Sequence, residues 1–242
     1  MRIPRIYIDK PLSSGATIEL SIEAHRHVVN VLRLKENSLI ILFNGDGNDY
    51  RAKIISIEKK LTLVNIENEQ VNQTTSPLNI ELGISLIKND KLDFALQKSV
   101  ELGISSITPL IANRSTIKLD EKRELKRHKH WQGIIQSACE QSGRSILPTL
   151  NPVHSISDWL DSSSVPGIVF EPTAEQTLSS LKITNEVRII IGPEGGFNET
   201  ELELIGQHDF YKTKLGPRIL RAETAAIAAI TTLQLLYGDL NR

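Results

Sequence analysis

Two short segments of the chain combine glycines with polar or charged residues in a way that suits ligand binding. The first is 189–198, where Gly192, Gly195 and Gly196 follow three consecutive isoleucines. Glycines in a turn let the backbone approach a ligand closely and expose its amide groups. The segment matches neither the phosphate-binding loop ending in Gly-Lys-Ser/Thr nor the GxGxxG dinucleotide fingerprint. A strand-to-helix turn without a ligand explains it equally well.

The second segment, 215–225 (LGPRILRAETA), repeats this arrangement of strand, glycine turn and helix. Glu223 and Thr224 suit the start of a helix, so capping accounts for both. Capping does not account for Arg218 and Arg221. Two guanidinium groups beside a glycine-rich crevice suit an anionic ligand, or a negative charge that develops during a reaction.

The elements that must position these turns alternate between strands and helices after Pro77, which predicts an α/β domain with a mainly parallel sheet. Ligands bind at the carboxyl ends of strands in such sheets. Apolar runs predict strands at 78–86, 104–111, 167–170, 187–191 and 212–215. Helices are predicted at 90–102, 120–141, 198–205 and 222–236. Asn198 and Glu201 form a capping box for the third helix, and Gly206 ends it.

The first 70 residues predict a different, smaller domain. Strands are expected at 3–8, 38–43, 50–57 and 61–66, with a helix at 21–32 capped by Ser21. Closely spaced strands with tight turns indicate a small barrel or a compact sheet. The polar segment 68–76, followed by Pro77, is the expected linker. The sequence therefore predicts two domains, 1–72 and 73–242.

Charge is distributed unevenly along the chain. The 28 basic and 29 acidic residues give a net charge of −1. This near-neutral net charge, taken alone, argues weakly against binding to nucleic acid. Residues 114–144, however, hold eight basic and four acidic residues, a local charge of +4. Such a basic segment binds phosphate or forms a solvated helix face, and the sequence favours neither reading over the other.

Several classes of protein are excluded or disfavoured. The single cysteine, Cys139, excludes an intramolecular disulfide, and no Cys/His cluster has metal-ligand spacing, so no metal is expected. His25 and His27 lack metal-ligating partners and are expected at the surface. The most apolar stretch, 225–237, is too short and too polar to span a membrane, and the start lacks a secretory signal. A cytoplasmic protein is expected.

The glycine turn at 192–196 followed by LGPRILRAETA resembles the paired cofactor loops of the SPOUT methyltransferases. The resemblance is closest to the bacterial 16S ribosomal RNA (uracil-N3)-methyltransferases. Supporting similarities lie in the start RIPRIYI and at 27–34 (HVVNVLRL), 98–103 (KSVELG), 114–115 and 140–144 (EQSGR). The resemblance covers essentially the whole chain in order, and the low overall basicity is its one departure.

This resemblance implies an N-terminal PUA-like β-barrel that helps to grip RNA and a SPOUT-type α/β domain with a C-terminal trefoil knot. The implied cofactor is S-adenosyl-L-methionine, and the implied assembly is a homodimer whose knot regions face each other. The implied substrate is N3 of a specific uridine in 16S rRNA, free or in the small ribosomal subunit. The exact nucleotide stays open.

The resemblance also implies roles for individual residues. Arg221 stabilises the charge that develops on the uracil when its imide nitrogen loses a proton. Glu223 is the second expected catalytic residue, although Glu194 stays open as the base. Cofactor binding is expected from Glu171, Gly192, Glu194, Gly195, Gly196, Leu215, Gly216, Ile219, Leu220, Arg221 and Thr224. RNA binding is expected from Arg2, Arg5, Arg33, Arg114, Lys126, Gln141 and Arg144.

Three alternatives stay open. Related SPOUT enzymes methylate the ribose 2′-hydroxyl of RNA. A non-catalytic RNA-binding protein of the translation machinery would use the basic segment alone and would not bind S-adenosylmethionine. A small-molecule enzyme that binds a nucleotide or phosphate is disfavoured, because the glycine turns contain no lysine and the sequence offers no metal-binding carboxylate pair.

Overall fold

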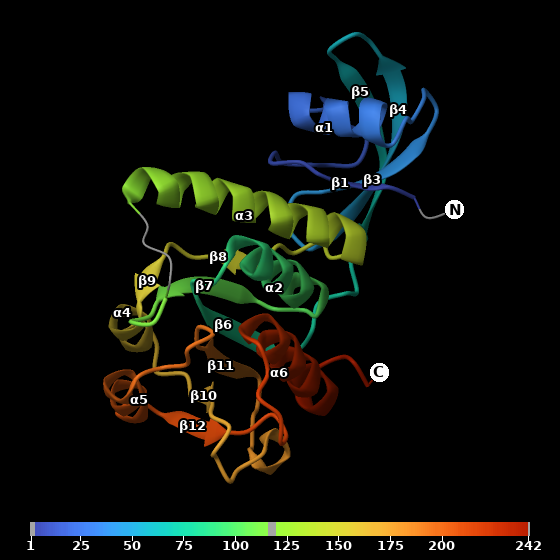
Figure 1. Cartoon of the computed structure of the whole chain (residues 1–242). Coiled ribbons are helices and arrows are strands. Elements are labelled where there is room, and N and C mark those ends of the chain that lie inside the picture. The colour runs from blue at the N-terminus through green and yellow to red at the C-terminus, as the bar shows by residue number, and fades with distance from the viewer. Residues whose placement is uncertain (1–2, 116–119, 242) are drawn as a thin grey trace. The chain divides into compact units, whose positions relative to one another are not determined.

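The computed structural model describes residues 3–115 and 120–241 and divides into two compact units (Figure 1). Unit 1 comprises Met1–Thr75 and Cys139–Leu147, and unit 2 comprises Ser76–Ala138 and Pro148–Arg242. Unit 1 thus includes a segment that lies well inside the second domain expected from the sequence. Within the described ranges, no helix is both long enough and apolar enough to cross a membrane.

Unit 1 is built on a five-stranded sheet with the order β1-β3-β4-β5-β2. The strands are β1 (Arg5–Tyr7), β2 (Thr17–Glu19), β3 (Leu39–Phe43), β4 (Asn48–Ile57) and β5 (Thr62–Val71). The β1–β3 pair is parallel, and the other pairs are antiparallel. Alternate side chains of β3, β4 and β5, such as Leu42, Ile54 and Val64, are fully buried. This period of two builds the core of the unit.

The helical region of unit 1 differs from the single helix expected at 21–32. Ser21 caps α1 (Ile22–Arg26) by accepting a hydrogen bond from the amide of Ala24, as predicted, but the chain then continues as the π-helix η1 (His27–Val31). β-branched valines fill this stretch and are poor helix formers. His25 is buried, and its Nδ1 lies 2.8 Å from Oγ1 of Thr62, so its expected surface location is wrong.

The expected linker at 68–76 is also partly wrong, because β5 continues to Val71. Its last residues pair with β4, Asn68 with Arg51 and Val71 with Asn48. The last five residues of β5, 67–71, are all exposed. Backbone hydrogen bonding therefore extends the strand, although the sequence there lacks the alternation of apolar residues that would predict a strand.

Unit 2 is an α/β unit whose strands all pair in parallel, in the order β12-β10-β11-β6-β7-β8, with β9 also paired to β7. The strands are β6 (Asn79–Ser85), β7 (Ser106–Ile111), β8 (Thr149–Leu150), β9 (His154–Ser155), β10 (Gly167–Phe170), β11 (Glu186–Ile191) and β12 (Phe210–Thr213). The central strands β6 and β11 are almost continuously buried, as parallel strands covered on both faces should be.

The helices include α2 (Asn89–Glu101), α3 (Glu121–Ser142), α4 (Ile156–Asp161), α5 (Glu199–Gly206) and α6 (Ala222–Tyr237), with a short 3₁₀ turn η2 (Leu178–Ser180). The α2 and α6 helices pack against each other (Figure 1). The last turn of α3 belongs to unit 1, where burial raises the pKa of the Cys139 thiol to about 11. That thiol is therefore protonated and poorly reactive at neutral pH.

Candidate functional site

The order of three neighbouring strands brings the two glycine-bearing segments to one edge of the sheet. β10 lies between β11 and β12, with Val169 opposite Ile190 and Phe170 opposite Thr213. Because all three strands are parallel, the residues that follow them emerge at the same edge. Gly192 directly follows β11, and the 215–221 turn follows β12.

A small cavity of about 80 Å³ lies at this edge. It is lined by Phe170, Glu171, Pro172, Leu215, Gly216, Arg218, Ile219, Leu220 and Ala225. Five of the predicted cofactor residues therefore share one hollow, and Glu171 after β10 is among them. The cavity is smaller than a typical ligand pocket, so a bound cofactor also needs the open surface beside it.

The backbone of the 215–221 turn suits a ligand with several hydrogen-bond acceptors. Within the described part of the chain, the amides of Leu215, Gly216, Ile219 and Leu220 form no hydrogen bond. Gly216 has a φ of +79°, a left-handed conformation that strongly favours glycine. Backbone amides without an internal acceptor are available to donate to acceptor atoms of a ligand.

The glycine turn after β11 is held in a compact form. The Gly196 amide donates to the Pro193 carbonyl at 2.9 Å, and the helix α5 follows at once. The predicted capping box is confirmed: the Asn198 side chain accepts from the Glu201 amide, and the Glu201 carboxylate accepts from the Asn198 amide, each at 2.8 Å. Gly206 is the last residue of α5 and Gln207 caps it.

A third loop reaches the glycine turn. Arg114, which follows β7 and was expected to contact RNA, donates from Nη1 to the Gly195 carbonyl at 2.7 Å. The Asn113 amide donates to Oε1 of the buried Glu201 at 2.7 Å. The sequence identified Glu201 only as a helix cap, because nothing local indicates a partner 88 residues away.

The predicted catalytic residues lie where α6 begins. Arg221 occupies the N-cap position, is exposed, and makes no capping hydrogen bond with its side chain. Glu223 is buried, and its Oε1 lies 3.5 Å from Nζ of Lys91 on α2. Thr224 and Glu194 are exposed. Arg221 is thus available to a substrate, whereas Glu223 is engaged in an ion pair within the protein.

Two residues that were expected to bind RNA are buried in unit 1. Arg5 is 8% exposed; Nη1 and Nη2 donate to the two carboxylate oxygens of Asp49 at 2.8 and 2.9 Å, and Nη2 also donates to Oγ of Ser145. Arg144 is also only 8% exposed. The structure holds both side chains inside unit 1, and the expectation that these two arginines contact phosphate stays a prediction. Arg33, Lys126 and Gln141 are exposed, and Arg2 lies outside the described residues.

Arg5→Ala should lower the free energy of unfolding by about 2–3 kcal/mol, because it leaves Asp49 partly buried without its charged partner. Burial raises the pKa of Asp49, but hydrogen bonds from Arg5, Ser145 and Asn72 outweigh it and hold that pKa below its usual value. The stabilisation is therefore present at neutral pH and is lost as the pH falls through the lowered pKa. Urea unfolding at pH 7 and pH 3 measures both effects.

Arg51→Ala is the matched control, since Arg51 is half exposed and lies 3.8 Å from Glu67. An exposed pair of this kind contributes well under 1 kcal/mol. If Arg5→Ala left stability unchanged and weakened RNA binding instead, the original expectation for Arg5 would be supported.

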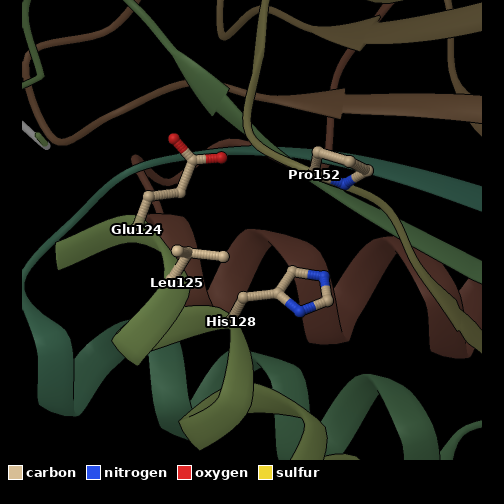
Figure 2. Close-up of a pocket in the computed structure, with 4 residues that line it drawn as sticks. All are labelled: Glu124, Leu125, His128 and Pro152. Carbon is tan, nitrogen blue, oxygen red and sulfur yellow. The ribbon is translucent and has the colours of Figure 1, made fainter. Parts of the chain in front are cut away.

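A larger cavity of about 410 Å³ lies elsewhere in unit 2, beside α3. Figure 2 shows its lining residues, Glu124, Leu125 and His128 on the helix and Pro152 on the facing segment. Glu124 accepts from the Val153 amide, and Nε2 of His128 lies 3.3 Å from the Leu150 carbonyl. These contacts fasten α3 to the segment before β9, and no predicted site residue lines the cavity.

Within the ranges that the structure covers, no group of three or more His, Cys, Asp or Glu side chains could hold a metal ion.

Comparison with known proteins gives consistent results over the whole chain. Residues 74–234 match the family described as RNA methyltransferase domain, and residues 23–67 match the RNA methyltransferase PUA domain. Ribosomal RNA small subunit methyltransferase E of Buchnera aphidicola (subsp. Schizaphis graminum) is 40% identical over 99% of both chains. The Bacillus subtilis protein of that name is 33% identical, over 94% of this chain and 95% of its own.

A solved structure agrees with these sequence matches. Ribosomal RNA small subunit methyltransferase E from Neisseria gonorrhoeae, bound to S-adenosyl methionine, is 38% identical with a TM-score of 0.93. The match covers 99% of this chain and 100% of that one.

Proposed function

Since this chain belongs to the ribosomal RNA small subunit methyltransferase E family, we propose that it methylates N3 of a specific uridine in 16S rRNA. It is an S-adenosylmethionine-dependent rRNA methyltransferase with a PUA-like domain and a SPOUT-type α/β domain. The observation that carries the proposal is that both glycine turns emerge at the same sheet edge, on either side of β10, near the exposed side chain of Arg221, which makes no capping hydrogen bond.

The cofactor would lie across this edge. The amides of Leu215, Gly216, Ile219 and Leu220 and the Glu171 carboxylate would bind its polar groups. Gly192, Gly195 and Gly196 would let it lie close to the backbone. When bound, S-adenosylmethionine supplies an electrophilic methyl group on a sulfonium centre. The protein's own task is to align the uracil nitrogen with that methyl group and to exclude water.

The uracil imide nitrogen must lose its proton before it can attack, so negative charge develops on the base. Arg221 is positioned at the start of α6 to stabilise that charge. The proton would pass to Glu194 or Glu223, the two carboxylates of the glycine segments. Glu194 is exposed, whereas Glu223 would first have to release Lys91. Loss of the pH dependence of turnover in Glu194→Gln or in Glu223→Gln would identify the base.

Exposed basic and polar side chains would supply the RNA contacts. Arg33 in residues 1–72, together with Lys126 and Gln141 on α3, would bind phosphate or ribose. The target base must leave its stack to reach the sheet edge, so a flipped or single-stranded uridine is expected.

Lys126→Ala should weaken RNA binding and lower the slope of log Kd against log salt by about one, because one phosphate contact is lost. Filter binding to 16S rRNA at several salt concentrations measures the slope. Lys182→Ala removes an exposed lysine from the acidic part of unit 2 and is the matched control. If Lys126→Ala and Lys182→Ala gave equal slopes, the basic residues of α3 would form a solvated helix face and would not bind RNA.

A homodimer and a C-terminal trefoil knot are part of the proposal. Apolar side chains stand exposed on the 215–221 turn and at the end of the chain, with Ile219 87% and Leu235 50% exposed. A partner would cover such side chains where they form one contiguous patch, whereas singly exposed apolar residues are ordinary on a monomer. A dimer would also bring a second copy's residues towards the same sheet edge. An rRNA substrate would place the protein in the cytoplasm.

The test uses small ribosomal subunits from a strain that lacks this gene. Incubation with the purified protein and labelled S-adenosylmethionine should add one methyl group, and mass mapping of the rRNA should place it on a uracil base. A methyl group on a ribose would support the 2′-O alternative. Failure to bind S-adenosylmethionine in calorimetry would leave only the non-catalytic RNA-binding alternative.

A further inference from the structure

The loop after β7 is tied to the glycine turn at two points, although β6 separates their strands in the sheet. Arg114 donates to the Gly195 carbonyl at 2.7 Å, and the Asn113 amide donates to Glu201 at 2.7 Å. Glu201 also holds the amide of Asn198, so one buried carboxylate joins the β7 loop to the start of α5. The glycine turn and the first turn of the helix that follows it are therefore both bonded to the same loop.

The β7 loop is itself tightly folded. The Ser115 amide donates to the Ala112 carbonyl at 2.9 Å, and the Ala112 amide donates back to Oγ of Ser115 at 3.3 Å. This closed turn fixes the backbone from which the Arg114 side chain extends. The Arg114 side chain thus extends from a hydrogen-bonded turn towards Gly195.

The Arg114 side chain lies along the glycine turn and does not merely touch it at one atom. A Cβ built on Gly195 would lie 3.4 Å from Cδ and 3.5 Å from Cβ of Arg114. The aliphatic stem thus packs against the Gly195 backbone while the guanidinium binds its carbonyl. This contact spans 81 residues of sequence, so it sets the position of the turn relative to the β7 loop.

The guanidinium keeps most of its binding capacity. A guanidinium has five N–H donors, and the contact with Gly195 uses Nη1. Arg114 is exposed, and among the residues with described positions no carboxylate forms an ion pair with it. Its positive charge and its remaining donors are therefore open to an anionic group, and a phosphate accepts two such donors at once.

We propose that Arg114 couples RNA binding to the cofactor turn by holding the Gly195 carbonyl and an RNA phosphate with one guanidinium. This inference rests on the proposed function, in which the glycine turn holds S-adenosylmethionine. A phosphate that fixes the guanidinium also fixes Gly195, so each ligand favours the arrangement that the other needs. Because such coupling is reciprocal, RNA and cofactor strengthen each other's binding by the same factor.

The experiment measures the Kd of S-adenosylhomocysteine, the product form of the cofactor, so that no turnover occurs. Equilibrium dialysis is carried out without RNA and with saturating small ribosomal subunits from the deletion strain. We expect the subunits to tighten S-adenosylhomocysteine binding to the wild-type protein about fivefold or more. In Arg114→Gln, the ratio of the two Kd values should fall below about twofold, and RNA binding should weaken.

Arg114→Lys distinguishes the coupling of RNA and cofactor binding from simple electrostatic attraction between a positive charge and RNA. A single ammonium keeps the charge for RNA but lacks the fork that binds two groups in fixed geometry. RNA affinity should therefore stay within about threefold of wild type while the coupling ratio falls as in Arg114→Gln. Arg123→Gln, which removes an exposed arginine of α3 that pairs with Asp120, is the matched control and should keep the full ratio.

The inference would be overturned if the ratio of the two Kd values in Arg114→Gln equalled that of the wild-type protein. It would also be overturned if Arg123→Gln lowered this ratio as much as Arg114→Gln does. Wild-type protein that binds S-adenosylhomocysteine equally well with and without subunits would overturn the inference and leave the proposed function intact. If the wild-type protein bound no S-adenosylhomocysteine, both the inference and the proposed function would be contradicted. Unchanged thermal midpoints in the variants verify that each one is folded.

Discussion

Arg221→Ala should lower the single-turnover rate of methyl transfer about 100- to 1000-fold while the affinity for S-adenosylmethionine changes little. The side chain sits at the entrance to α6, where it makes no capping hydrogen bond and is exposed to an incoming base. Removal of one donor that stabilises a developing anion in a dry site has an effect of this size. Cofactor affinity should persist, because the backbone amides of the 215–221 turn do not depend on this guanidinium.

Arg218→Ala is the control for this result, since Arg218 is an exposed arginine on the same turn. It lines the small cavity, so its removal should affect cofactor affinity more than the rate of the chemical step. A normal single-turnover rate in Arg221→Ala would exclude that residue from the reaction. A selective loss of rate in Arg218→Ala would transfer the role to Arg218.

Arg188→Ala should lower the free energy of unfolding by about 3–5 kcal/mol, a larger loss than that expected for Arg5→Ala. Arg188 is 1% exposed, lies 3.3 Å from Glu81, and stacks on the Trp159 ring at 3.9 Å. Its Nη1 also donates to the carbonyls of Leu160 and Ser163, so the truncation leaves several buried acceptors without a donor. Burial lowers the pKa of Arg188, but the neighbouring Glu81 supports the charged form.

Urea unfolding followed by tryptophan fluorescence measures this loss, because Trp159 is in direct contact with the guanidinium. Glu81→Gln is the companion variant: it keeps an acceptor for Nε1 of Trp159, which donates to Glu81 at 2.6 Å, but removes the charge. Its effect should be smaller, since the carbonyl contacts of Arg188 remain. A loss below 1 kcal/mol in Arg188→Ala would contradict the importance of this buried cluster.

The sheet edge that carries the site could be predicted from local pattern. The isoleucines before Gly192 predicted a buried strand, and β11 ends at Ile191. The helix predicted at 222–236 is α6, and it begins at Ala222 as expected. These elements are long or strongly apolar, so their periodicity is evident within a dozen residues. The short elements β8, β9 and α4 escaped prediction because two to six residues carry too little periodicity.

The environment of individual arginines could not be predicted in the same way. Arg5 resembled a surface cation because its partner Asp49 lies 44 residues away and Ser145 lies 140 residues away. The contact between Arg114 and the Gly195 carbonyl could not be predicted for the same reason, since the two residues are 81 positions apart. Tertiary contacts of this kind leave no local signal, so sequence pattern locates a loop but not the partners of its side chains.

The composition of unit 1 has a consequence for how the protein is made. Tyr7 and Asn72 bond to Glu140 and Gly143, and Arg5 bonds to Ser145, so residues 139–147 complete a unit that otherwise ends at Thr75. During translation, the contacts of Arg5, Tyr7 and Asn72 with this segment cannot form until the chain has grown past it. A gene fragment that ends after the first seventy-odd codons would encode unit 1 without this segment. Asp49 would then lack its donor Ser145, and the amide of Tyr7 would lack its acceptor Glu140.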